Sequence, residues 1–267
     1  MKRKVIPVLI GMLLIVLILA GAAGVFLFQR YSGSKEEADI NAYFGLNGSQ
    51  EVAIVWNQEL TEEKGLLQDE RCYLKLDTVH EMLNERFYVD HNEKLLLYTL
   101  PEETVQIGIG ETADGYTAAV EQDGDVWLAL DYVKQYSDFN YALYTEPNRV
   151  VLTTNWDTLQ SAELKKNTAL RVRGGVKSEV LQNLEKGTKV TVLEEMENWD
   201  QVQTQDGYIG YVQKKHLTDP AEETPVKDTG YVEPDYTGNL RDHKIDLAWH
   251  QVTVESANST FPGVMSG

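Results

Sequence analysis

The residues of this chain that could do chemistry are few and widely scattered. Asp123 and Asp125 flank a glycine, and two carboxylates this close together could act as a general acid and base. An Asp-Gly step between two apolar runs is also a hairpin signal, and we favour the hairpin. The five histidines show no paired metal-ligand spacing; they are His80, His91, His216, His243 and His250. No catalytic residue, metal site or cofactor is therefore predicted.

Cys72 is the only cysteine of the chain. A single thiol excludes an intrachain disulfide and a Cys-based zinc site. An exported form of this protein would therefore depend on packing alone for its stability. His80 and His91 have no histidine counterparts in the second copy of the repeat described below, and we interpret both as surface or structural residues.

Three aromatic residues, Trp199, Tyr208 and Tyr211, could line a shallow groove for a peptide or a glycan. They fall within residues 167–218, where short β-rich runs alternate with turn signals. The turn signals are Gly174-Gly175, Lys186-Gly187, Glu197-Asn198 and Asp206-Gly207. Five strands in about fifty residues are typical of a small closed barrel. The alternative is that Trp199 and Tyr211 are only packing residues of that barrel.

The order of these elements resembles a bacterial SH3-like domain. The segment LRVRGG stands at the usual entry motif, LEKGTKVTVL at the central hairpin, NWDQV at the tryptophan strand, and GYIGYVQKKHL at the closing strand and short helix. Gly175 occupies a position where the family usually has proline. The resemblance implies an all-β SH3-like barrel whose relatives often bind cell-wall peptides, or serve as spacers or docking modules.

An internal repeat precedes the barrel. Residues 73–79 (YLKLDTV) match residues 127–133 (WLALDYV), 54 positions later. Each copy predicts a strand, a helix with Asp77 or Asp131 as N-cap, and a hairpin that turns near residues 90–93 or 146–148. The repeat resembles the copper amine oxidase N-terminal-like domain over residues 46–156. That resemblance implies a duplicated α+β stalk domain that serves as a spacer, without copper chemistry.

An uncharged apolar run from Val5 to Phe28 follows the basic residues 1–4. About 20 apolar residues span a bilayer, so a transmembrane anchor is predicted. The basic residues place the N-terminus in the cytoplasm and the rest outside the cell membrane. The alternative is a signal peptide cleaved near Ala20-Gly21-Ala22. A polar juxtamembrane segment, residues 29–45, leads to the repeat.

The net charge of −18 is concentrated in one part of the chain. Residues 36–166 carry 9 basic and 26 acidic side chains. This field disfavours nucleic acid as a partner. Residues 219–242 are acidic and contain prolines, which predicts an extended linker.

The segment Lys244–Val252 (KIDLAWHQV) resembles the first strand of the TIM barrel of glycoside hydrolase family 18. That barrel takes about 250 residues, so residues 243–267 are expected to be the truncated start of this domain. The resemblance implies a catalytic Asp-x-x-Asp-x-Asp-x-Glu motif, which the chain lacks, so the chain as written is predicted to be inactive.

Two functions remain open. In the first, the chain is the membrane-anchored, wall-binding and spacer region of a family 18 glycosidase that acts on N-acetylglucosamine-containing polymers. In the second, it is a complete, non-enzymatic, membrane-tethered binding or scaffold protein. An extracytoplasmic sensor is disfavoured because residues 1–4 are too few for a cytoplasmic output domain. The sequence leaves the oligomeric state and the wall component open.

Overall fold

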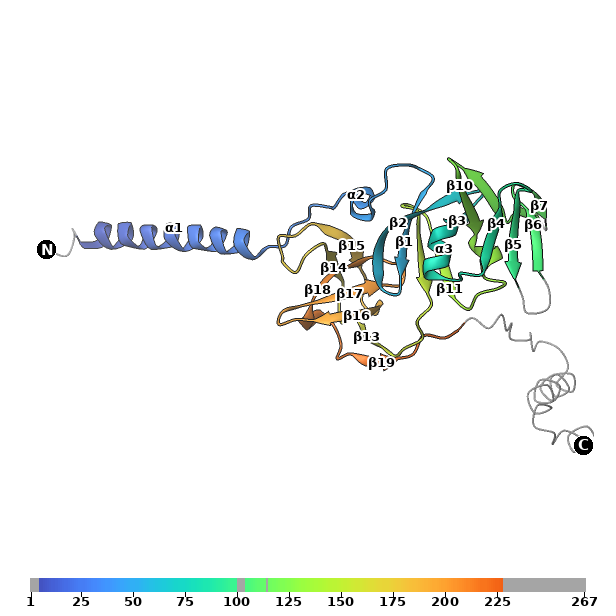
Figure 1. Cartoon of the computed structure of the whole chain (residues 1–267). Helices are drawn as coiled ribbons and strands as arrows, with labels where there is room; N and C mark the ends of the chain where they lie inside the picture. The colour runs from blue at the N-terminus through green and yellow to red at the C-terminus, as the bar shows by residue number, and fades with distance from the viewer. Residues whose placement is uncertain (1–4, 100–103, 114, 228–267) are drawn as a thin grey trace, which may run out of the picture. The chain divides into compact units, whose positions relative to one another are not determined.

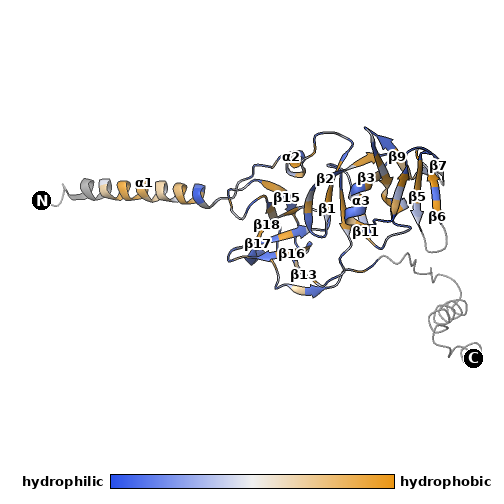
Figure 2. Ribbon diagram, in the orientation of Figure 1, coloured by the Kyte–Doolittle hydropathy of each residue, from blue (hydrophilic) through white to orange (hydrophobic). Residues whose placement is uncertain are grey.

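A computed structural model describes residues 5–99, 104–113 and 115–227 of this chain (Figure 1). The first helix, α1 (Val5–Tyr31), contains a stretch from Gly11 to Arg30 that is long and apolar enough to cross a membrane. Its side chains from Met12 to Leu19 are more than half exposed. Figure 2 shows hydrophobic residues along α1 and hydrophilic ones at its C-terminal end. The same properties fit an anchor or a signal sequence.

Residues 46–156 contain a large sheet whose strand order is β11-β12-β1-β2-β3-β10-β9. Its strands are β1 (Glu51–Trp56), β2 (Glu59–Gln68), β3 (Arg71–Lys75), β9 (Ala119–Gln122), β10 (Asp125–Ala129), β11 (Asn140–Tyr144) and β12 (Arg149–Thr153). A smaller sheet contains β4 (Phe87–Asp90), β5 (Leu95–Thr99) and β6 (Thr104–Gly108), and a short hairpin contains β7 (Thr112–Ala113) and β8 (Tyr116–Thr117). Helices α3 (Leu76–Met82) and α4 (Leu130–Val133) directly follow β3 and β10.

The two copies of the repeat have the same order of elements, and their strand bounds follow the 54-residue offset. The series β3, α3, β4, β5 corresponds to β10, α4, β11, β12. Strands β3 and β10 pair antiparallel, with Leu74 directly opposite its own counterpart Leu128. The hairpins differ: β4 and β5 pair with β6 in the small sheet, whereas β11 and β12 extend the large sheet through β1.

The predicted helix caps were wrong. The N-cap residues are Lys75 and Ala129, neither of which caps with its side chain, and Asp77 and Asp131 lie within the first turns. Asp131 instead accepts hydrogen bonds from the Arg71 guanidinium and from a tyrosine hydroxyl of β11. Its carboxylate is used for tertiary contacts rather than for capping.

The predicted hairpin at Asp123 is confirmed. Asp123 and Gly124 lie between β9 and β10 with φ angles of 54° and 86°. Positive φ at both central residues is the requirement of a type I′ turn. The carboxylate of Asp125 forms an ion pair with Lys75, 2.5 Å away. Cys72 is buried in β3, and burial raises the pKa of its thiol.

The barrel consists of the five predicted strands β14 (Thr168–Arg171), β15 (Val180–Leu184), β16 (Lys189–Glu195), β17 (Trp199–Thr204) and β18 (Ile209–Gln213). The short helix predicted after the closing strand is the 3-10 helix η2 (Lys214–His216). Two strands that the sequence did not predict extend the same sheet: β13 (Leu159–Glu163) pairs with β16, and β19 (Ala221–Glu223) pairs with β13. The first residues of the predicted 219–242 linker are therefore part of the sheet.

Strand β1 is buried on both faces and joins the repeat region to the barrel. Val52 and Ile54 belong to the core of the repeat region, while Ala53 and Val55 pack with buried barrel residues such as Val202. Alternating side chains of a strand point to opposite faces, so β1 contributes to two cores. The second of these, which we call the junction core, binds the barrel to the rest of the described chain.

The segment predicted as a polar juxtamembrane stretch also enters the junction core. Helix α2 (Ile40–Phe44) begins at Asp39, whose side chain accepts from the backbone N–H of Ala42 and caps the helix. Phe44 is 1% exposed. Part of residues 29–45, which the sequence predicts as a polar juxtamembrane segment, therefore packs against the barrel. Residues 228–267, which hold most of the predicted linker and the family 18-like segment, lie outside the described residues.

Candidate ligand-binding groove

The outer face of β17 and β18 carries the residues best placed to bind a ligand. Trp199, Gln201 and Gln203 alternate with the inward-facing Asp200 and Val202 along β17. Opposite them on β18 lie Gln213, Tyr211 and Ile209, in that order. Because side chains on one strand face recur every second residue, this pattern produces one continuous aromatic and amide surface.

Trp199, Tyr211 and Gly174 together line one hollow of about 380 Å³. A Cβ at Gly174 would lie 3.3 Å from both Cβ and Cγ of Trp199 and 3.6 Å from a ring carbon of Tyr211. A side chain at this position would therefore press closely against Trp199, and glycine avoids that contact. Both aromatic residues are half-buried, so they combine packing against the barrel with a face available to a ligand. The arrangement suits stacking on a sugar ring or a peptide.

Trp199 also borders a second hollow, of about 530 Å³, at the end of the barrel that holds η2. Asp200 is 2% exposed there and accepts a hydrogen bond from the backbone N–H of Met196. The Nζ of Lys214 lies 3.8 Å from Asp200 and 2.5 Å from Glu195. The hydrogen bond to Glu195 raises the pKa of Lys214. At this end of the groove, the positive charge of Lys214 therefore lies close to the negative charges of Glu195 and Asp200.

On its other side, Tyr211 borders a third hollow of about 780 Å³. Tyr43 of α2 and Gln58 of the β1–β2 turn line it together with Leu159 of β13. The Tyr43 hydroxyl donates to the carbonyl of Ile209 (2.6 Å) and accepts from the N–H of the same residue (3.0 Å). These contacts fix Tyr43 at the edge of β18. This part of the groove combines the barrel with residues from outside it.

Tyr208 does not lie in the groove with Trp199 and Tyr211. It is 7% exposed and belongs to the junction core. Its ring lies 6.3 Å from Tyr43, stacked, and 5.1 Å from Phe44, edge-on, and the Arg149 guanidinium lies 4.6 Å from its centroid. Burial raises the pKa of Tyr208. The predicted grouping of three aromatics is thus corrected to two, because Tyr208 packs between domains.

Sequence reasoning missed the residues that complete the groove from outside the barrel, namely Gln58 and Leu159. Gln58 adopts φ = 72° in the tight β1–β2 turn, and Leu159 lies on the unpredicted strand β13. No local signal in the sequence links either residue to the aromatic pair. Only the packing of the two cores on β1 brings them together.

Elsewhere in the described chain, no group of three or more His, Cys, Asp and Glu side chains is arranged to hold a metal ion. His80 contacts the carbonyl of Phe87 through Nε2 at 2.7 Å. His216 contacts the hydroxyl of Thr168 through Nδ1 at 2.9 Å. Burial, followed by nearby lysines, lowers the pKa of His216. Both histidines make structural contacts.

Comparison with known proteins identifies the barrel. Residues 166–218 match the family described as Bacterial SH3 domain. The structure of NlpC1 from Trichomonas vaginalis is similar at 16% identity with a TM-score of 0.22. The alignment covers 50% of this chain, and the chain spans 40% of that protein. No curated protein matches this sequence. The predicted bacterial SH3-like domain at residues 167–218 is thereby confirmed.

Proposed function

We propose that this chain is the membrane-anchored, extracytoplasmic, wall-binding and spacer region of a family 18 glycosidase. The observation that carries the binding role is the groove on the bacterial SH3 domain, where Trp199, Tyr211 and Gly174 together line one hollow. Such an aromatic surface suits a cell-wall peptide or glycan.

The proposed location is supported by α1. Helix α1 exposes its apolar side chains over a length that suits a bilayer core. Lys2, Arg3 and Lys4 precede it, and basic residues favour the cytoplasmic side. The barrel then lies outside the cell membrane, where the wall is its nearest polymer.

The spacer role is proposed for residues 46–156. The two copies have the same element order, and β3 and β10 pair about the Leu74–Leu128 position. Packing each copy against the other buries the apolar faces that a single copy would expose. The surface of this region is strongly acidic in composition, which favours hydration over binding to anionic polymers. We therefore assign to it distance and orientation rather than recognition.

The enzymatic part of the proposal depends on Lys244–Val252, which resembles the first strand of the family 18 barrel. In such a protein the SH3 domain would raise the effective concentration of a catalytic domain on its substrate. Sequencing the gene beyond the codon for Gly267 tests this part. An open frame with the Asp-x-x-Asp-x-Asp-x-Glu motif supports the glycosidase, and a stop codon leaves a tethered binding protein.

Wall binding is tested with the full chain in detergent micelles and sedimented cell-wall sacculi. We expect the chain to co-sediment, and Trp199→Ala and Tyr211→Ala each to reduce the bound fraction severalfold. Tyr88→Ala is the matched control, because Tyr88 is a 56%-exposed aromatic on β4, outside the groove. Equal binding by all the variants would show that the groove has no role, and absence of binding by the parent chain would refute the wall-binding function.

A further inference from the structure

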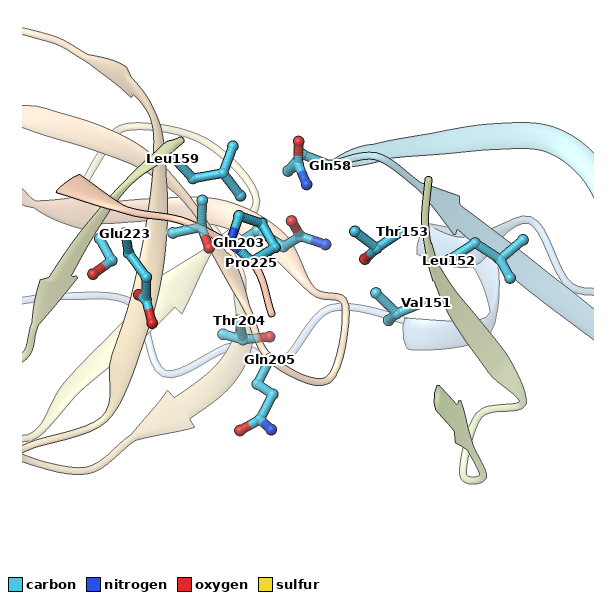
Figure 3. A pocket seen from close by; sticks show the side chains of 12 residues that line it. Gln58, Val151, Leu152, Thr153, Leu159, Gln203, Thr204, Gln205, Glu223 and Pro225 are labelled. Atoms are coloured by element: carbon cyan, nitrogen blue, oxygen red, sulfur yellow. The ribbon is translucent and has the colours of Figure 1, made fainter. Parts of the chain in front are cut away.

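A cavity of about 240 Å³ lies where the barrel meets the repeat region (Figure 3). Barrel strands form one side of it and β12 the other, with Gln58 at one edge. It adjoins the aromatic groove, because Gln58, Leu159 and Thr191 line both this cavity and the hollow beside Tyr211. We call it the junction cavity.

Gln203 is the residue of the junction cavity on which the choice of ligand depends in our argument. It is 7% exposed, and its side-chain amide forms no hydrogen bond with any described residue. Its neighbour Thr204, by contrast, uses its hydroxyl to donate to Asp206. Neither atom of this amide is among the fully buried, unpaired side-chain atoms of the described residues, so solvent still reaches it. The amide of Gln203 is therefore accessible from the cavity and available to a ligand.

Most of the other polar side chains in the lining are uncharged and can both donate and accept hydrogen bonds. Gln58 and Gln205 add two more primary amides, and Thr153 and Thr191 add hydroxyls. The one carboxylate, Glu223, is held by Lys189 at 2.5 Å. Primary amides and hydroxyls can each serve as donor and acceptor. A ring that carries hydroxyls and an acetamido group matches such a lining better than a peptide backbone, which offers one donor and one acceptor per residue.

We propose that the junction cavity binds one N-acetylated sugar unit of a wall glycan, with the amide of Gln203 as its specificity-determining hydrogen-bonding group. This inference rests on the proposed wall-binding function and names the ligand of that site. The acetamido group pairs with Gln203, and its methyl group contacts the apolar side chains of Leu159, Val151 and Pro225 that also line the cavity.

The geometry of β17 extends the site to a polymer. Trp199, Gln201 and Gln203 occupy alternate positions on one strand face, so Trp199 and Gln203 lie roughly 13 Å apart. Adjacent hollows lie between them, so a short oligosaccharide bound along β17 would extend from the Trp199–Tyr211 pair toward the junction cavity. The aromatic pair would stack on one ring while Gln203 reads the acetamido group of another.

The test uses the full chain in detergent micelles and isothermal titration calorimetry with the trimer of N-acetylglucosamine. The de-N-acetylated trimer and pentaglycine are the comparison ligands. We expect binding of the acetylated trimer, about tenfold weaker binding by Gln203→Leu, which is the effect of losing one buried hydrogen bond, and little binding of either comparison ligand. Gln106→Leu is the control, since Gln106 is exposed on β6. Because no described residue pairs with the Gln203 amide, Gln203→Leu should fold, which circular dichroism checks.

The outcomes separate this inference from the function on which it rests. A chain that sediments with sacculi but ignores the acetylated trimer, binds the deacetylated trimer equally, or prefers pentaglycine overturns the sugar assignment and leaves wall binding intact. Unchanged affinity in Gln203→Leu overturns the role of that amide. A chain that binds the trimer but not sacculi supports the sugar site and refutes wall binding.

Discussion

Replacing Arg149 by methionine should strongly destabilise the described body of this protein. Arg149 is 4% exposed and lies on β12, yet its guanidinium reaches the β17–β18 turn of the barrel. It donates to the carboxylate of Asp206 at 2.9 Å, to the carbonyl of Asp206 at 2.5 Å and to the carbonyl of Pro147 at 2.9 Å. The rings of Tyr208 and Tyr144 lie 4.6 and 5.1 Å from it. Methionine keeps the apolar stem and removes all of these interactions.

The magnitude follows from burial. Breaking a buried ion pair costs about 3–5 kcal/mol, and the lower end applies here because the Asp206 side chain is 26% exposed and can rehydrate. We therefore expect a loss of about 3 kcal/mol in the free energy of unfolding, which is about 150-fold in the folding equilibrium. For a unit of this size the midpoint of thermal unfolding should fall by roughly 6–12 °C.

The assay is urea denaturation of the full chain in micelles, followed by tryptophan fluorescence. Lys189→Met is the matched control, because the Lys189 and Glu223 side chains are 54% and 46% exposed and such pairs contribute about 1 kcal/mol or less. Combining Arg149→Met with Asp206→Asn should cost less than the two single changes together, since they remove one shared interaction. A loss under 1 kcal/mol for Arg149→Met, or strict additivity in the double variant, would refute this account of the junction.

Other predictions concern the same junction. Gly207→Ala should lower the free energy of unfolding by roughly 2 kcal/mol or more. A Cβ there lies 2.7 Å from a side-chain carbon of β12, and φ is +88°. Gly187→Ala is the control for backbone strain alone in the same urea assay, because φ is +84° there and the space around it is open. Residues 167–218 expressed alone should lack a cooperative unfolding transition by calorimetry, because their core is shared with β1 and α2. Burial lowers the pKa of His216 below its ordinary 6.5, so the unfolded chain takes up the proton first and stability falls as pH drops through 6.5; His216→Gln should reduce this slope in urea titrations between pH 5 and 8.

The barrel could be predicted from sequence because its signals are local. Gly187 and Gly207 both adopt positive φ in their turns, a conformation that glycine adopts without steric cost. The strands between the turn signals are short, and β16 and β18 alternate in burial, so the turn signals delimit them. The 54-residue repeat was visible for the same reason, since Leu74 and Leu128 lie in matching local sequences that form matching strands.

The junction could not be predicted because it depends on contacts distant in sequence. The local sequence predicts Tyr208 to be an exposed aromatic residue of the barrel. In the structure, Phe44 of α2 and the Arg149 guanidinium pack against its ring. Phe44 lies in a segment whose composition is polar, and a single buried aromatic does not reveal its partner. Asp131 has the sequence context of a helix cap, but Arg71 lies within reach and a tertiary contact competes successfully with capping. In each case the prediction followed a local sequence preference, whereas the structure is determined by a contact distant in sequence.

The junction also changes which residues determine ligand choice. In a barrel that folds alone, the groove would end at Tyr211, and specificity would depend on the aromatic pair. Here β1 places the turn that carries Gln58 against the barrel, and the same packing closes the junction cavity over Gln203. Under the proposed function, the repeat region would therefore do more than set a distance. Because Gln58 and β12 line the hollows beside the barrel, a change in the junction core is expected to alter both stability and ligand binding.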